Sequence, residues 1–191
     1  GLIDADAGRV LHAVNLGIES SDLAAQASAA LGIRFRLEND VKAAALGASR
    51  PHRQDGATAY LNLGTGVAAG IVVDGEIWRG ARGVAGEIGH LSVDPAGRLC
   101  GCGQRGCIET LCGGGALARA WGRGGALPIR DLFDAADLGD PEAMLLRGDL
   151  FRGAAAAVRA LILPLRLGRV GIRGGVAALG RPPPTRHRRS A

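Results

Sequence analysis

The side chains best suited to chemistry lie in one glycine-rich segment, residues 86–109. Cys100, Cys102 and Cys107 follow a C-x-C-x4-C spacing, and His90 stands ten residues before the first of them. Structural zinc sites use four thiolate or imidazole ligands in a tetrahedron, and three cysteines with one histidine are a common set. The spacing therefore predicts a structural zinc site held by these four residues.

Two other interpretations of the cysteines are weaker. A single cysteine or histidine would be an ordinary buried side chain, but four potential ligands within eighteen residues are hard to obtain by chance. A disulfide framework is disfavoured because three clustered thiols cannot all pair and nothing else indicates export. We expect the remaining cysteine, Cys112, to be a small buried residue outside the metal set.

A second candidate for chemistry is the pair Asn39 and Asp40. The alternating segment 33–37 predicts a strand, and the residues from 41 onward predict a helix. Ligands of open α/β sheets bind at the carboxyl ends of strands, which favours a site at this junction. Aspartate also often caps helices, and local sequence by itself favours that role for Asp40.

A third candidate is the triplet Gly64, Thr65 and Gly66. It separates two predicted strands, and the second of these, 67–73, is followed by a predicted hairpin turn at Asp74 and Gly75. Glycines in such a turn let backbone N–H groups approach an anion, and a threonine hydroxyl adds a donor. Any hairpin can use glycine, so the triplet alone is a weak signal.

The remaining chain predicts helices and strands that would position these residues. Two strands surround a turn at residues 6–8, and a helix over 22–32 ends at Gly32. Further helices are predicted over 116–123 and 129–137, and a long amphipathic helix begins at Pro141. Its expected core-facing residues recur at helical spacing: Met144, Leu145, Phe151, Ala155, Val158, Leu161 and Ile162.

Composition places the chain among globular proteins. Of 191 residues, 47% are apolar and 3% aromatic, so an aliphatic core is expected. No stretch is apolar enough for a membrane span and no leader pattern opens the sequence, so we expect a cytoplasmic protein. The net charge of +5 arises from seven arginines after residue 163, without the interleaved aromatics expected of a nucleic-acid site.

Taken together, several segments resemble the ROK family of bacterial sugar kinases and sugar-responsive repressors, and glucokinase-type members are the most similar. The resemblance extends from residue 1 to about 176, and its most specific part is GEIGH followed by CGCGQRGCIE. LENDVKAAALGA, LNLGTGVAAGIVVDGEIWRG and CGGGALARA match as well. The resemblance implies an α/β, actin-like ATPase (ribonuclease H-like) fold, whose two lobes close on sugar and ATP.

The resemblance also implies roles for individual residues. Asp40 would be the general base for the reacting sugar hydroxyl. The other expected sugar-binding residues are Asn39, Glu87, His90 and Glu109. ATP with Mg²⁺ would be held at two turns, namely Gly64, Thr65 and Gly66 at the phosphates, and Gly174 and Gly175 beside the adenosine. The expected zinc ligands are His90, Cys100, Cys102 and Cys107, so His90 would serve both metal and sugar.

The chain departs from the family pattern at both ends. It has no Asp-x-Gly-Gly-Thr turn, which in the family forms the first ATP phosphate loop. We therefore expect residues 1–50 to be part of the first lobe and 51–176 to be most of the second lobe. Residues 177–191 are expected to be a disordered or out-of-frame tail.

The leading functional hypothesis is an ATP-dependent hexose kinase, and the missing phosphate loop leaves its activity open. The alternative is the sugar-sensing domain of a repressor, in which case DNA would be a partner of the complete protein. A third interpretation is a zinc-stabilised remnant that binds sugar without catalysis. The family also implies a homodimer, whereas the identity of the sugar stays open.

Overall fold

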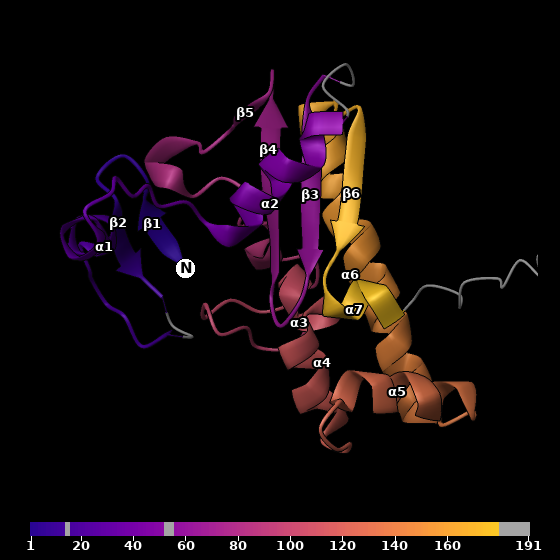
Figure 1. Cartoon of the computed structure of the whole chain (residues 1–191). Helices are drawn as coiled ribbons and strands as arrows, with labels where there is room; N and C mark the ends of the chain where they lie inside the picture. The colour runs from indigo at the N-terminus through magenta and orange to yellow at the C-terminus, as the bar shows by residue number, and fades with distance from the viewer. Residues whose placement is uncertain (14–15, 52–55, 180–191) are drawn as a thin grey trace, which may run out of the picture.

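The central element of this computed structural model, which describes residues 1–13, 16–51 and 56–179, is a mixed β-sheet. Within those residues the strand order is β5-β4-β3-β6 (Figure 1). Strand β3 runs antiparallel to β4 and parallel to β6. The strands are β3 (Thr58–Leu63), β4 (Val67–Val73), β5 (Glu76–Ile77) and β6 (Arg169–Arg173).

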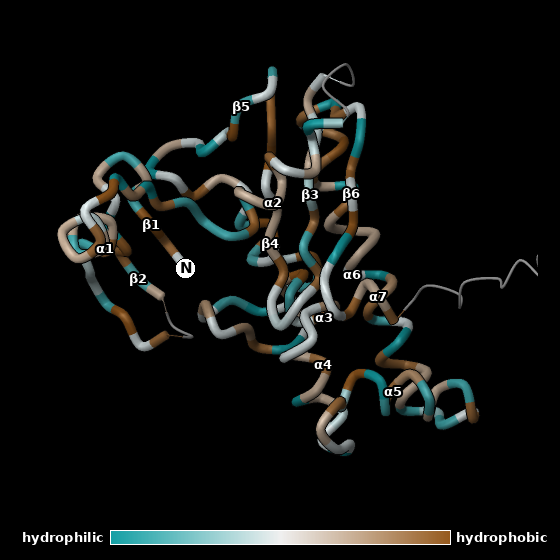
Figure 2. The backbone as a smooth tube through the Cα atoms, in the orientation of Figure 1, coloured by the Kyte–Doolittle hydropathy of each residue, from teal (hydrophilic) through white to brown (hydrophobic). Residues whose placement is uncertain are grey.

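The hairpins of this sheet follow the sequence prediction. Asp74 and Gly75, between β4 and β5, both have positive φ, as a two-residue turn of this type requires. β4 is hydrophobic along most of its length (Figure 2), and five of its seven residues are buried. A strand covered on both faces needs such a composition, so helices are expected on both sides.

Helix α2 (Asp40–Ser49) packs directly against β4 on one face. A Cβ at Gly70 of β4 would lie 2.5 Å from the Ala45 Cβ and 2.7 Å from the Val41 carbonyl oxygen. Only glycine fits at this strand position because the helix backbone approaches so closely. This contact fixes the start of α2, and therefore Asn39 and Asp40, relative to the sheet.

The opposite face is covered by α3 (Ile108–Cys112) and α6 (Pro141–Leu165). Asp140 caps α6 by accepting from the Ala143 N–H at 3.0 Å, and Pro141 follows at the first helical position. Helices α4 (Gly114–Trp121) and α5 (Pro128–Asp137) extend this layer. The core between the layers is aliphatic, as expected, and its largest fully buried side chains include Leu61, Ile108, Leu117, Leu132 and Leu161.

A smaller sheet lies to the side of the main one (Figure 1). It consists of β1 (Leu2–Asp4) and β2 (Arg9–His12), followed by helix α1 (Leu23–Leu31). Gly32 ends α1 in the left-handed conformation, as predicted. β1 contacts the 3-10 turn at Ala81–Gly83, and this contact brings the first residues of the chain to the segment that precedes Glu87.

One expectation about secondary structure was wrong, and one helix was missed. Residues 33–37 do not form a strand, because a strand needs a neighbour for its ladder and the Phe35 N–H donates instead to the Ser28 hydroxyl at 3.1 Å. Helix α3 was not predicted, because its five residues are too few for a recognisable period and glycines follow it at once.

The predicted core face of α6 was also wrong. Met144, Leu145, Phe151 and Ile162 are all exposed, and of the predicted set only Leu161 is fully buried. The buried face is made of smaller residues, since α6 packs closely against α3: a Cβ at Gly153 would lie 2.8 Å from the Leu111 Cβ. The residues that face the core are Ala143, Leu146, Leu150, Gly153, Ala157 and Leu161.

After β6 the chain turns at Gly174 into α7 (Gly175–Leu179), so a turn lies where one was expected at Gly174 and Gly175. The rest of the predicted tail, 180–191, lies outside the described residues. None of the helices in the described ranges combines the length and apolar character that a membrane span requires.

Candidate functional site

The four predicted metal ligands converge. One ligand atom each from His90, Cys100, Cys102 and Cys107 lies within 4.8 Å of all the others. The Cys100 sulfur is 3.7 Å from His90 Nδ1, and the Cys102 and Cys107 sulfurs are 3.6 Å apart. Sulfurs about 2.3 Å from a tetrahedral zinc are separated by about 3.8 Å. The donor set and its dimensions therefore fit a four-coordinate metal ion.

Glycines determine the shape of the loop that carries these ligands. Gly106 has φ +63°, and a Cβ there would lie 1.6 Å from the Asp94 carbonyl oxygen. Gly103, with φ +90°, closes a tight turn in which the Cys100 N–H donates to the Gln104 carbonyl at 2.8 Å. These turns bring Cys102 and Cys107 onto the same side of the loop as Cys100.

The thiols of this loop differ in acidity. The Gln104 backbone N–H lowers the pKa of Cys102 to about 6, so this thiol is largely ionised at neutral pH. Burial raises the pKa of Cys107 to about 12, and burial likewise raises that of Cys112 to about 12. Cys112 is buried in α3 and does not belong to the ligand group, as expected.

Residues 86–90 lie directly on β4. The Ala69 N–H donates to the Gly86 carbonyl at 2.8 Å, and a Cβ at Gly86 would lie 1.8 Å from the Ala69 carbonyl oxygen. A Cβ at Gly89 would lie 2.2 Å from the Val67 carbonyl oxygen. The two glycines thus hold the intervening backbone against the sheet, and this contact sets the positions of Glu87 and His90.

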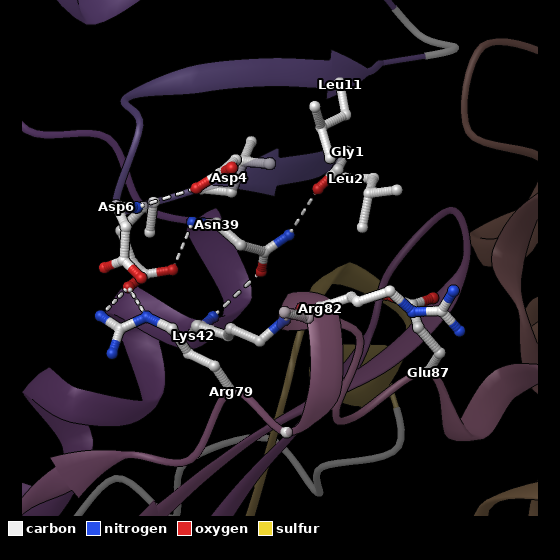
Figure 3. A pocket seen from close by; sticks show the side chains of 15 residues that line it. Gly1, Leu2, Asp4, Asp6, Leu11, Asn39, Lys42, Arg79, Arg82 and Glu87 are labelled. Carbon is white, nitrogen blue, oxygen red and sulfur yellow. Dashed lines mark hydrogen bonds and ion pairs between the residues drawn. The ribbon is translucent and has the colours of Figure 1, made fainter.

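A cavity of about 420 Å³, with charged, polar and apolar lining residues, opens where β1, the start of α2 and residues 79–87 meet (Figure 3). Asn39 and Glu87 both line it. The Asn39 Oδ1 accepts from the Val41 and Lys42 N–H groups at 3.0 and 3.1 Å, and its Nδ2 donates to the Gly1 carbonyl at 3.1 Å. Asn39 is therefore the helix cap, and the local expectation that Asp40 has this role was wrong.

Asp40 itself is exposed in the first turn of α2. No side-chain hydrogen bond or ion pair of its carboxylate is found within the described residues. Because Asn39 satisfies the helix N–H groups, the carboxylate of Asp40 stays available. An exposed carboxylate that no donor engages is suited to accepting a proton.

Three residues that support this cavity were not predicted as site residues. Arg79 donates to Glu38 from both Nε and Nη2, and Glu38 in turn accepts from the Asn39 N–H at 2.9 Å. Lys42, which is 5% exposed, donates from Nζ to the Gly83 carbonyl at 2.8 Å. These contacts join the start of α2 to residues 79–83. The only sequence signal was that Lys42 is the single lysine of the chain.

The other expected sugar residues lie outside this cavity. Glu109 Oε2 accepts from the Val67 N–H at 2.9 Å, and a Cβ at Gly66 would lie 2.6 Å from the same oxygen. His90 turns Nδ1 toward Cys100. Neither these two residues nor Asp40 lines the 420 Å³ cavity, which thus unites only Asn39 and Glu87 of the predicted set.

A second cavity, of about 580 Å³, contains residues from both predicted nucleotide turns. Gly64 and Thr65 line it together with Gly175. The Gly114 N–H donates to the Gly64 carbonyl at 2.8 Å and attaches α4 to the first turn. A Cβ at Gly174 would lie 2.2 Å from the Leu63 carbonyl oxygen, so this glycine is needed for close packing. Apolar lining completes the cavity, including Ala118, Leu127, Pro128, Ile129, Val176 and Leu179.

Comparison with known proteins agrees with these features. A model of the ROK family matches residues 1–186. The chain belongs to the ROK family. A glucokinase from Halalkalibacterium halodurans is 34% identical over 199 aligned residues, which cover 94% of this chain and 60% of the glucokinase. The chain thus spans about three fifths of the length of this relative.

Solved structures of the family confirm the α/β, actin-like ATPase fold. A ROK hexokinase from Thermus thermophilus superposes with a TM-score of 0.81 at 34% identity, covering 95% of this chain and 62% of the hexokinase. A Streptomyces griseus glucokinase in complex with glucose and AMPPNP gives 0.74 at 32% identity, with 94% and 64% covered. A transcriptional regulator homologous to the E. coli MLC protein gives 0.77 at 32% identity, with 94% and 48% covered.

Proposed function

We propose that the protein is an ATP-dependent hexose kinase of the glucokinase type. The observation that carries this proposal is the pair of cavities. One is lined by charged and polar side chains that include Asn39 and Glu87, alongside apolar ones, and the other is largely apolar and lined by Gly64, Thr65 and Gly175. A sugar requires the first kind of surface and an adenosine requires the second. The related glucokinases and hexokinase support the same assignment.

The residues of the polar side would bind the sugar and take up its proton. Asp40 would accept the proton of the attacking hydroxyl, while Asn39 holds the helix start that aims it. Glu87 offers an acceptor for a further hydroxyl. Glu109 and His90 are proposed as additional sugar ligands next to the glycine turn and the metal group.

The nucleotide would lie in the second cavity. Gly64, Thr65 and Gly66 would approach its phosphates, and Gly174 and Gly175 its adenosine. When bound, ATP with Mg²⁺ supplies the phosphoryl group and neutralises its charge. The contribution of the chain is positioning, since the glycine turn is connected to α4 by the Gly115 N–H bond to the Thr65 carbonyl at 2.8 Å.

Zinc is the metal we propose for His90, Cys100, Cys102 and Cys107. Four protein ligands leave no open coordination position, so its role would be structural. It would fix the loop that carries Glu87 at one end and Glu109 at the other. A cytoplasmic homodimer stays a prediction.

Phosphorylation of glucose by the chain with ATP and Mg²⁺ tests the proposed reaction. We expect Asp40→Asn to lower kcat by about a hundredfold or more, because it removes the general base. Asp74→Asn is a matched control, since Asp74 is exposed in the β4–β5 hairpin, lines neither cavity, and asparagine tolerates its positive φ. Equal rates for both variants and the wild type would show that Asp40 is not the base.

The second candidate is a sugar-sensing domain, and the similarity to the transcriptional regulator supports it. Calorimetry with glucose separates the two functions. Sugar binding without Asp40-dependent ATP consumption would favour the sensor, whereas Asp40-dependent formation of sugar phosphate would favour the kinase.

A further inference from the structure

Arg82 has a backbone conformation that its residue type disfavours. Within the described residues, three residues other than glycine have positive φ, namely Asp74 at 52°, Arg82 at 56° and Arg166 at 48°. Asp74 belongs to a two-residue hairpin turn, and Arg166 ends α6 in a left-handed cap. Local structure thus explains two of the three. Arg82 lies inside the Ala81–Gly83 turn, where glycine or asparagine would be less strained.

The turn around Arg82 is held from several sides. Lys42 Nζ donates to the Gly83 carbonyl at 2.8 Å, and the Ala85 N–H donates to the Arg79 carbonyl at 2.9 Å. Gly80 and Gly83 on either side of Arg82 have φ +65° and +73°. The scaffold therefore imposes the left-handed conformation on an arginine. Such outliers are concentrated at functional sites.

The side chain of Arg82 lines the 420 Å³ cavity and extends toward Glu87 (Figure 3). Two other cations line the same cavity, but Arg79 is paired with Glu38 and Lys42 is bonded to the Gly83 carbonyl. Among the described residues, no hydrogen bond or ion pair of the Arg82 guanidinium is found. Its donors therefore face the cavity near Glu87 without a hydrogen bond to any described residue.

The chemistry of the two facing groups is complementary. A guanidinium only donates hydrogen bonds, and an ionised carboxylate only accepts them. A sugar hydroxyl does both, so one hydroxyl can donate to Glu87 and accept from Arg82. We propose that Arg82 is a sugar-binding residue that, with Glu87, selects for a hydroxyl at one ring position. This inference rests on the proposed function, because it takes the 420 Å³ cavity as the sugar site.

Arg82→Gly tests this proposal, because the substitution should preserve thermal stability while it weakens sugar binding. Glycine removes the backbone strain, so the melting temperature should stay at or above that of the wild type. Calorimetry without ATP first identifies which of glucose, mannose and N-acetylmannosamine binds the wild type best. For that sugar, the dissociation constant of Arg82→Gly should be about tenfold or more above that of the wild type. Arg36→Gly removes the same charge from an exposed position on a neighbouring cavity and should leave sugar affinity unchanged.

Monodeoxy analogues of that sugar identify the contacted hydroxyl. The analogue that lacks it should bind the wild type and Arg82→Gly equally, whereas every other analogue should keep the tenfold difference. Unchanged affinity of Arg82→Gly, or the same loss for every analogue, would overturn the inference. Asp40-dependent phosphorylation with unchanged affinity in Arg82→Gly would reject the role of Arg82 alone. Failure of the wild type to bind any of these sugars would reject both proposals.

Discussion

Replacement of Gly86 by alanine tests whether contact with β4 positions the loop that carries Glu87 and His90. The new Cβ would lie 1.8 Å from the Ala69 carbonyl oxygen and 2.9 Å from its carbon, closer than real Cβ contacts. The backbone there also has φ +94°, which strains any residue with a side chain. Both atoms belong to a central strand, so the loop rather than the strand must move.

The expected loss of stability has two parts. The left-handed backbone costs alanine about 1–2 kcal/mol, and loss of the 2.8 Å bond from the Ala69 N–H to the Gly86 carbonyl costs about 1 kcal/mol more. With some strain from the displaced loop, we expect Gly86→Ala to lower the free energy of unfolding by about 2–4 kcal/mol. Sugar affinity should fall as well, since Glu87 is the next residue.

Urea denaturation measures the first effect and calorimetry with glucose the second. Gly101→Ala is the matched control in the same loop, because nothing lies within 4 Å of its Cβ position and its φ is not positive. That variant should differ from the wild type by no more than about 0.5 kcal/mol. If Gly86→Ala and Gly101→Ala unfold at the same urea concentration, the contact with β4 does not hold the loop and the reasoning fails.

Three further predictions concern the metal group and α6. Cys102→Ser should abolish bound zinc, lower the unfolding midpoint and make that midpoint insensitive to a chelator. Cys112→Ala should retain zinc, because Cys112 is outside the ligand group. Metal analysis of both variants after purification without added metal tests the zinc predictions. The Ala143 N–H lowers the pKa of Asp140, so this carboxylate stabilises the fold above its ordinary value of 3.8 and less as pH falls through the lowered pKa. The urea midpoints of wild type and Asp140→Ala should therefore differ at pH 7 and begin to converge once the pH falls below 3.8, and a constant gap would contradict the role of the charge. Gly148→Ala in α6 meets nothing within 4 Å and should raise the free energy of unfolding by about 0.5–1 kcal/mol in urea, whereas a decrease would show that this face is covered.

The sequence predicted those parts of the site in which residue type and spacing are sufficient. The clustering of His90, Cys100, Cys102 and Cys107 could be predicted because zinc restricts both the kind and the number of its ligands, and these four residues match that set. The hairpin at Asp74 and the turn at Gly174 could be placed because few residues tolerate positive φ. In each case the structure is determined by the types and spacing of residues that are close together in the sequence.

The parts that could not be predicted depend on contacts between distant segments. α6 has apolar residues on two faces, and only the position of α3 decides that the face with Gly153 is buried and the face with Phe151 is exposed. The ion pair between Glu38 and Arg79 joins residues 41 positions apart, and no sequence spacing predicts a contact over such a separation. Arg82 is similarly invisible in the sequence, since its unusual φ results from the turn that Lys42 holds.

The order of Asn39 and Asp40 in the sequence connects a local feature, the cap of α2, with the proposed site. A helix start needs one side-chain acceptor for its free N–H groups, and a phosphoryl-transfer site needs a carboxylate that is not already engaged. Had Asp40 capped α2, as local sequence favoured, its oxygens would be occupied by backbone donors and would be poorer proton acceptors. Asn39 takes the cap with the oxygen of a neutral amide, and its Nδ2 donates to the carbonyl of Gly1, the residue before β1. The asparagine thus connects the start of the helix to the residue that precedes β1, and it leaves the carboxylate of the next residue unengaged, as the proposed role of a base requires.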